Sequence, residues 1–186
     1  MTFAEHAEAY RARLERALSV LADPSLAALA DALEAARSRG AAVYVLGNGG
    51  SAANAAHLAN DLAQGLGARG INAWALADST PAVTAAANDH GYAEVFVTAL
   101  GPRLRAEDLV LLLSASGDSE NLVRAARLAR ERGAVVAAVT GFTGGRLAEL
   151  AAVHVHVPSD VGDYGPPEDL QLIIDHVVTS WLRGAP

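Results

Sequence analysis

The segment AVYVLGNGGS, residues 42–51, decides the fold, because five apolar residues run directly into a glycine-rich turn that ends in serine. The apolar residues are typical of a buried parallel strand, and the Ala-rich stretch that follows Ser51 favours a helix. A strand, a glycine-rich turn and a helix in this order open a βαβ unit. Such a turn exposes backbone N–H groups at a helix N-terminus, so it is a candidate anion-binding site.

Outward from this segment, short apolar runs alternate with helical stretches along the rest of the chain. We predict five strands, at residues 42–46, 71–76, 109–113, 135–139 and 153–157. The helices expected between and after them span residues 51–66, 81–88, 93–100, 119–132, 145–150 and 167–182. Parallel strands joined by crossover helices give this alternation. It predicts an α/β fold, a three-layer α/β/α sandwich of the flavodoxin-like type with a five-stranded parallel sheet.

Two helices precede the first strand. The spacing of Thr2 and Glu5 fits a capping box, which starts a long first helix. A second helix is expected over residues 25–38. We expect one domain over residues 1–186, in which residues 1–40 form a helical N-terminal extension.

A second turn with the chemistry of an anion site follows the third predicted strand. It reads SASGDS, residues 114–119, and it places three hydroxyls around one glycine. Either turn taken alone could be ordinary, with glycine for a tight bend and serine for a helix cap. Both turns lie at the same edge of a parallel sheet, however, and this favours a ligand site.

The chemistry of the two turns favours a phosphate monoester over a nucleotide. The Walker pattern with its lysine does not occur, which disfavours a nucleoside triphosphatase. The first turn does not read Gly-x-Gly-x-x-Gly, which disfavours a dinucleotide site. We therefore expect neither a nucleotide nor a redox cofactor.

The composition limits the remaining functions. The chain has 186 residues, no cysteine and a formal net charge of -7. Without cysteine, neither a disulfide nor a thiolate can take part, and metal ligands must be histidine or oxygen donors. No basic block occurs that would neutralise many phosphates, so we expect no nucleic acid partner. No long apolar segment occurs either, so we expect no membrane association and a cytoplasmic location.

The two turns, together with AAHLANDL at residues 55–62 and NDHG at residues 88–91, resemble the phosphoheptose isomerase branch of the SIS (sugar isomerase) domains. The resemblance covers nearly the whole chain. It implies a homotetramer with active sites at the subunit interfaces, in which the N-terminal extension is used in oligomerisation. It also implies the conversion of sedoheptulose 7-phosphate to D-glycero-D-manno-heptose 7-phosphate, an aldose-ketose isomerisation that passes through an enediol.

The resemblance assigns roles to the polar residues of the turns. The residues expected to bind the phosphorylated sugar are Asn48, Gly49, Gly50, Ser51, Asp89, Ser114, Ser116, Ser119 and Glu168. The four serines match the phosphate-binding hydroxyls of the family, whereas Asn48 and Asp89 match positions near the sugar. The glycines let the backbone approach the ligand closely.

The resemblance also implies a zinc site. His57 matches a zinc-ligand histidine of the family, and Asp61 stands where the family has a glutamate that serves as base or ligand. In its last helix the family has a glutamine and, eight positions later, a histidine; Glu168 and His176 have this spacing here. We therefore expect zinc to be held by His57, Asp61, Glu168 and His176.

The positions of these residues along their helices separate them into two pairs. His57 and Asp61 are four residues apart, so both side chains lie on one face of the predicted helix. Glu168 and His176 would lie about 12 Å apart along a straight helix and about 80° round its axis, too far to share one ion easily. Either Glu168 precedes the regular helix, or the two side chains serve sites in different subunits. The resemblance favours an interfacial site.

An aldose-ketose isomerase needs a base, an acid and stabilisation of a developing oxyanion. We expect Asp61 to move the proton and His176 to act as its acid partner, or zinc on the four ligands to polarise the carbonyl instead. Two functions of other classes stay open: a non-catalytic SIS scaffold, like the tetrameric relative that binds the bacterial replication initiator, and a phosphosugar-sensing module. A scaffold would not need the four metal-type residues together.

Overall fold

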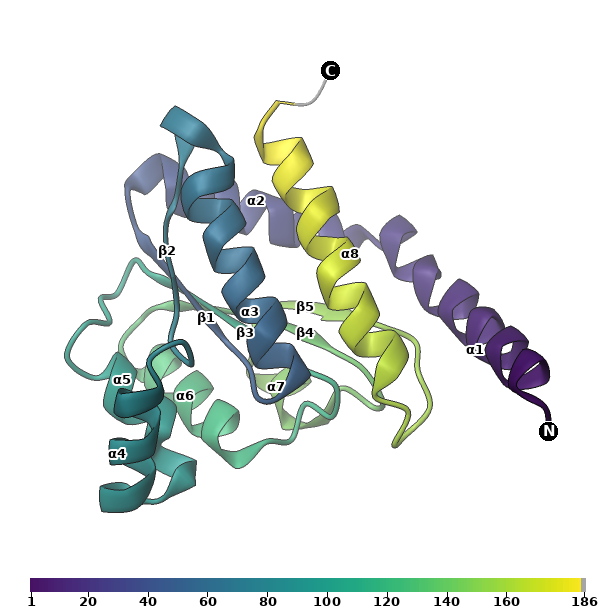
Figure 1. Cartoon of the computed structure of the whole chain (residues 1–186). Coiled ribbons are helices and arrows are strands. Elements are labelled where there is room, and N and C mark those ends of the chain that lie inside the picture. The colour runs from purple at the N-terminus through teal and green to yellow at the C-terminus, as the bar shows by residue number, and fades with distance from the viewer. Residues whose placement is uncertain (185–186) are drawn as a thin grey trace.

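The computed structural model describes residues 1–184 and has a five-stranded parallel sheet between two layers of helices (Figure 1). The strands are β1 (Ala42–Leu46), β2 (Asn72–Ala75), β3 (Leu109–Ser114), β4 (Val135–Thr140) and β5 (Val153–His156). They lie in the order β2-β1-β3-β4-β5, and every neighbouring pair is parallel. The predicted α/β/α sandwich with five parallel strands is confirmed.

Strands β1 and β3 lie inside the sheet, and their residues are buried on both faces. Val43 and Val45 belong to one core, whereas Tyr44 and Leu46 belong to the other. This alternation follows from the two-residue period of a strand. It explains why the sequence shows near-continuous apolar runs in place of an alternating pattern.

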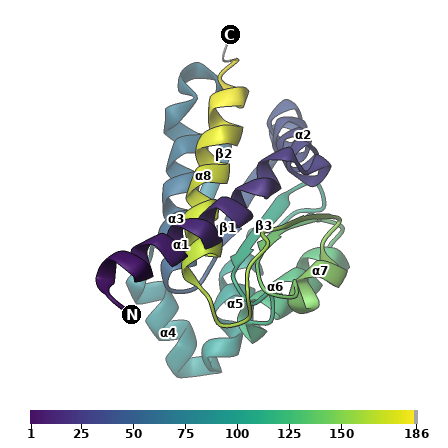
Figure 2. The same ribbon diagram turned by 90° about the vertical axis from the view of Figure 1, so that its right-hand side faces the viewer.

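Helices cover both faces of the sheet. One face is covered by α2 (Pro24–Arg39), α3 (Gly50–Asn60) and α8 (Gly165–Leu182). The other face is covered by α4 (Thr80–His90), α5 (Val95–Leu100), α6 (Glu120–Glu131) and α7 (Gly145–Leu150). Figures 1 and 2 show α3 and α8 side by side. Both begin near the carboxyl ends of the strands, where the two turns were expected to bind an anion.

The N-terminal helices form as predicted, with one interruption. The helix α1 (Phe3–Ala17) begins at a complete capping box between Thr2 and Glu5. A 3₁₀ turn (Leu18–Ala22) separates it from α2, which ends at Gly40 in the left-handed conformation with φ 66°. Most of α1 is exposed, and the helix extends away from the sandwich (Figure 1).

Two helix boundaries matter for the site. The helix expected over residues 51–66 ends at Asn60, and a π-helical turn (Asp61–Gly65) follows. π-helical turns are rare in proteins, and those that occur are often found at functional sites. The helix α8 begins at Gly165, before the predicted residue 167, so Glu168 lies in its first turn. The alternative in which Glu168 precedes the regular helix is therefore wrong.

The other predicted strands and helices shift by at most two residues at either end. Within residues 1–184, no helix combines the length and the apolar character that crossing a membrane requires.

Candidate active site

The two predicted anion-binding turns line one small pocket, here called the hydroxyl-lined pocket, at the carboxyl ends of β1 and β3. Its volume is about 100 Å³. The polar residues that line it are Asn48, Ser51, Ser114, Ser116, Ser119, Tyr164 and Glu168. Because β1 pairs directly with β3, with Leu46 beside Leu112, the turns that follow the two strands lie next to each other. All four predicted serines therefore meet in one place.

The serine hydroxyls of the second turn keep their protons available for a ligand. Ser114 Oγ accepts the N–H of Gly117 at 3.1 Å, and Ser116 Oγ accepts the N–H of Asp118 at 3.2 Å. Each hydroxyl uses a lone pair in this contact and can still donate. Ser119 is the N-cap of α6, and its side chain makes no capping hydrogen bond. The turn thus offers three hydroxyl donors to an anion.

Helix N-termini add backbone donors to the same pocket. The first N–H groups of α3 and α6 lack partners inside the helix and carry a partial positive charge. Gly49, the N-cap of α3, has φ 55°, a conformation that a side chain disfavours. A Cβ atom on Gly50 would collide with the carboxylate of Glu168. Glycine at this position therefore lets Glu168 pack directly onto the start of α3.

An amide pair holds Asn48 at the pocket. Its Nδ2 donates to Oδ1 of Asn121 at 3.0 Å, and Nδ2 of Asn121 donates back to Oδ1 of Asn48 at 2.9 Å. Tyr92 donates its hydroxyl proton to the same Asn48 oxygen at 2.8 Å. Asn121 is buried, so the pair links the first turn to the start of α6. Sequence reasoning missed Asn121, although a polar residue two positions after Ser119 in the first turn of α6 is a signal that could have found it.

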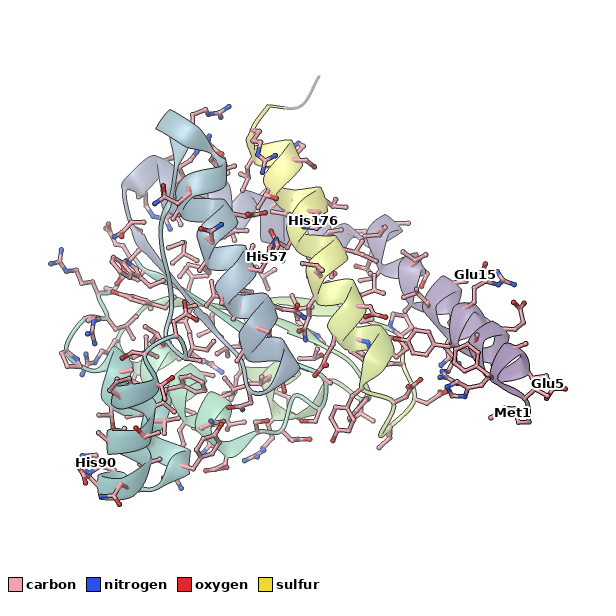
Figure 3. The ribbon with its side chains drawn as sticks, viewed as in Figure 1. Met1, Glu5, Glu15, His57, His90 and His176 are labelled. Atoms are coloured by element: carbon pink, nitrogen blue, oxygen red, sulfur yellow. The ribbon has the colours of Figure 1, made fainter. Side chains whose placement is uncertain are left out.

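A second set of polar side chains, here called the imidazole-carboxylate group, lies farther along α3 and α8. It consists of His57, Asp61, Asp175 and His176, and one ligand atom from each lies within 4.8 Å of the others. Figure 3 shows His57 on α3 and His176 on α8 facing one another. The group thus depends on the packing of two helices that are distant in sequence.

The distances in the imidazole-carboxylate group converge on Nε2 of His57. This atom lies 3.3 Å from Nε2 of His176, 3.6 Å from Oδ2 of Asp61 and 3.8 Å from Oδ2 of Asp175. Imidazole nitrogen and carboxylate oxygen are the donors that zinc takes when thiolates are absent. The group therefore has the chemistry and the spacing of a site for a divalent metal ion.

The group has a buried acidic side and an exposed imidazole side. The side chain of Asp175 is 1% exposed, compared with 18% for Asp61 and 47% for His57. Burial raises the pKa of the Asp175 carboxyl to about 6, and the negative charge of Asp61 acts in the same direction. The nearby imidazoles of His57 and His176 oppose this rise in pKa.

The structure separates the predicted metal ligands. His57, Asp61 and His176 meet in one group, but Glu168 lies in the hydroxyl-lined pocket and not in the group. Glu168 and His176 are eight residues apart on α8, about 12 Å along a straight helix, which explains why they lie in different sets of residues. The group instead contains Asp175, which sequence reasoning missed. An acid within the apolar run LIIDHVV, residues 172–178, is the signal that could have found it.

Asp89 lies apart from both sets of residues. It is exposed at the end of α4 and lines a different pocket of about 1060 Å³, together with Trp74 and His90. In Figure 3 its neighbour His90 is far from His57 and His176. Within one chain, the structure does not bring Asp89 to the serines.

The fold and the pocket at the carboxyl ends of β1 and β3 define a sugar isomerase (SIS) domain, and residues 5–141 match the SIS domain family. A phosphoheptose isomerase of Mycobacterium bovis (strain BCG / Pasteur 1173P2) is 39% identical over 160 residues, which cover 85% of this chain and 81% of that protein. The chain belongs to the phosphoheptose isomerase family.

Two solved structures agree with this assignment. A phosphoheptose isomerase from Neisseria gonorrhoeae superimposes with a TM-score of 0.90 at 27% identity, covering 99% of this chain and 100% of that chain. A phosphoheptose isomerase from Francisella tularensis gives a TM-score of 0.88 at 26% identity, covering 98% of both chains.

Proposed function

We propose that this protein is an aldose-ketose isomerase that converts sedoheptulose 7-phosphate to D-glycero-D-manno-heptose 7-phosphate through an enediol. One observation carries the proposal. The helices α3 and α8 both begin at the hydroxyl-lined pocket and run side by side to the imidazole-carboxylate group. An anion-binding end and an acid-base end therefore lie along the same pair of helices, as a phosphorylated sugar requires.

The serine hydroxyls and the N-termini of α3 and α6 bind the phosphate. Asp61 takes the proton from one of the two carbons between which the carbonyl moves and returns it to the other. His176 is its acid partner, which gives a proton to the carbonyl oxygen and takes one from the adjacent hydroxyl. Oδ2 of Asp61 faces His57, which leaves Oδ1 for the substrate proton.

Zinc fits the imidazole-carboxylate group, and His57, Asp61 and His176 would hold it. When bound, it would polarise the carbonyl or hydroxyl oxygen in place of the proton transfer by His176, because an imidazole nitrogen that binds a metal carries no proton to give. Glu168 was expected as a further ligand; from its place in the hydroxyl-lined pocket it would reach a metal only in a neighbouring subunit. In its own chain Glu168 contacts a hydroxyl of the sugar.

The active form is a homotetramer with active sites at the subunit interfaces, and residues 1–40 form part of the contacts. The exposed helix α1 and three exposed apolar side chains support this: Phe3 is 86% exposed, Trp74 58% and Trp181 53%. Because Trp74 lines the same pocket as Asp89, a neighbour packed there would bring Asp89 to an interface. The absence of cysteine suits a cytoplasmic enzyme.

The test is to incubate the purified protein with sedoheptulose 7-phosphate and to follow the appearance of aldose. We expect turnover with added Zn²⁺ and little turnover with a chelator, and a metal analysis of the same sample checks the ion. Unphosphorylated sedoheptulose is the matched control and should react far more slowly, because it lacks the group that the serines bind. If no aldose forms under any of these conditions, the proposed function is wrong.

A further inference from the structure

Asp175 is a buried carboxylate that faces the imidazole of His57 at 3.8 Å, beyond hydrogen-bond distance. It lies in the middle of α8, is 1% exposed, and neither Oδ1 nor Oδ2 has a hydrogen-bond partner within residues 1–184. Thr179, one turn farther along, donates its hydroxyl proton to the main-chain oxygen of Asp175 at 2.8 Å. A buried carboxylate without a hydrogen-bond partner is costly, and the imidazole that faces it is charged only when it is protonated. The presence of this carboxylate therefore points to a ligand that supplies positive charge.

The direction of the carboxylate identifies that ligand as a cation shared with the neighbouring side chains. Oδ2 of Asp175 faces Nε2 of His57, the same atom that faces Asp61 and His176. A carboxylate that only orients a metal-binding imidazole contacts the other ring nitrogen, which is not bound to the metal. Asp175 is therefore positioned to bind the metal directly and not to orient the imidazole of His57.

The distances agree with this placement. In a tetrahedral zinc site with metal-ligand distances of about 2.0–2.1 Å, neighbouring ligand atoms are roughly 3.3–3.4 Å apart. The separations of 3.3, 3.6 and 3.8 Å from Nε2 of His57 are close to this ligand-to-ligand distance. Two carboxylates and two neutral imidazoles also balance the charge of one divalent cation.

We propose that Asp175 is a metal ligand, and that it completes with His57, Asp61 and His176 a four-ligand site contributed by a single chain. Glu168 is not part of this set. The proposal deepens the proposed function, on which it rests for its role in the reaction. Metal binding is measured without any sugar, so the metal-ligand proposal and the proposed isomerase function can fail separately.

The experiment compares Zn²⁺ affinity among variants of the purified full-length protein, by competition with a chromogenic chelator after metal removal. Asp175→Asn keeps the size of the side chain and removes its charge, and we expect it to weaken Zn²⁺ binding by about 100-fold, the upper end of the losses seen even for indirect partners. Asp31→Asn, an exposed aspartate on α2, is the charge-matched control and should bind as the wild type does. Glu168→Ala should stay within about twofold of the wild type.

A second readout distinguishes a ligand from a residue that only supports the fold. The visible spectrum of the Co²⁺-loaded protein reports the ligand set directly, so Asp175→Asn should change it whereas Asp31→Asn should not. If Asp175→Asn does not fold, Asp175→Ala, which leaves no polar atom to bury, takes its place in both measurements. A loss of Zn²⁺ affinity below tenfold in these variants, or an unchanged Co²⁺ spectrum, would overturn the proposal. A large loss in Glu168→Ala would overturn it as well, because Glu168 would then be the ligand.

Discussion

The hydroxyl-lined pocket and the imidazole-carboxylate group are built in different ways, although the same two helices connect them. The pocket takes most of its donors from two short turns, each continuous in sequence and each at the start of a helix. The imidazole-carboxylate group takes its members from residues 57–61 and 175–176, which only helix packing brings together. The pocket is therefore formed by residues close together in sequence, whereas the imidazole-carboxylate group is formed by tertiary packing.

This difference predicts how each region responds to substitution. The hydroxyls of the pocket are held by local hydrogen bonds, such as that of Ser116 to the N–H of Asp118, so a substitution there removes one donor and little else. In the imidazole-carboxylate group, each side chain acts on the charge of its neighbours. Substitutions in the group should therefore change turnover and stability, whereas those in the pocket should mainly change substrate binding.

The largest effect is expected for Asp61→Asn. The amide keeps the shape of the side chain but cannot accept the substrate proton, so kcat should fall by about 10³-fold. Circular dichroism and thermal unfolding should show an intact fold, because Asp61 lies in a partly exposed turn. An active Asp61→Asn variant would remove Asp61 from the mechanism and would leave His176 without its base.

Asp175→Asn should stabilise the metal-free protein. The folded-state pKa of this carboxyl, about 6, lies above its ordinary value of 3.8, so the charged form is disfavoured by folding. The cost is absent below pH 4, grows as pH rises towards 6, and is fully present above it, where it amounts to about 2–3 kcal/mol. Urea unfolding in chelator at pH 7.5 should show that gain in free energy of unfolding.

The same comparison at pH 4 is the control. There the wild type and Asp175→Asn should differ little, because the carboxyl is protonated in the folded chain and still partly protonated in the unfolded chain, near its ordinary pKa of 3.8, so most of the cost is absent. Equal stability of the two proteins at pH 7.5 would mean that the carboxylate is compensated in the folded chain.

The fold could be predicted from the sequence because its signals are local. Apolar runs such as residues 109–113 mark buried strands, and the glycine and serine turns mark the strand-to-helix junctions. The π-helical turn at Asp61–Gly65 was not predictable, since its residues continue the helical pattern of α3. What ends the helix there is not encoded in that pattern.

The site could be predicted only where it is local. The four serines and Asn48 follow their strands directly, and the structure brings them to one pocket. His57 and Asp61 could be paired by their spacing, but their partners on α8 depend on which face of α8 packs against α3. Resemblance pointed to Glu168, whereas packing puts Asp175 next to His57. Burial raises the pKa of Asp175, and the burial of a residue cannot be predicted from the spacing of residues in the sequence alone.

A smaller effect is expected for Ser116→Ala. The loss of one hydroxyl donor to a charged phosphate should lower kcat/KM by about tenfold, mostly through KM, because the same contact exists before and during the reaction. Ser180→Ala, which removes a hydroxyl bonded to the main chain of α8, is the matched control and should leave kinetics unchanged. A fall in kcat with constant KM would mean that Ser116 takes part in the chemical step. Substitutions in the pocket would then change turnover, as those in the imidazole-carboxylate group do.

The smallest effect is expected for Glu168→Gln. This variant tests whether Glu168 belongs to the hydroxyl-lined pocket or to the imidazole-carboxylate group. The carboxylate of Glu168 packs on Gly50 at the start of α3, where the helix N-terminus favours negative charge. A phosphate that enters the pocket competes for the same N-terminus and is repelled by roughly 1 kcal/mol at surface-like screening. The neutral amide removes this repulsion and keeps the packing, so inorganic phosphate should bind about fivefold more tightly.

Calorimetric titration with inorganic phosphate at low and high salt checks this expectation, and the gain should shrink as salt screens the repulsion. Zn²⁺ affinity, measured on the same sample, should not change if Glu168 belongs to the pocket alone. Weaker phosphate binding in Glu168→Gln would instead show that the carboxylate orders the serine donors. In that case the pocket, like the imidazole-carboxylate group, would depend on charge contributed from across the helix pair.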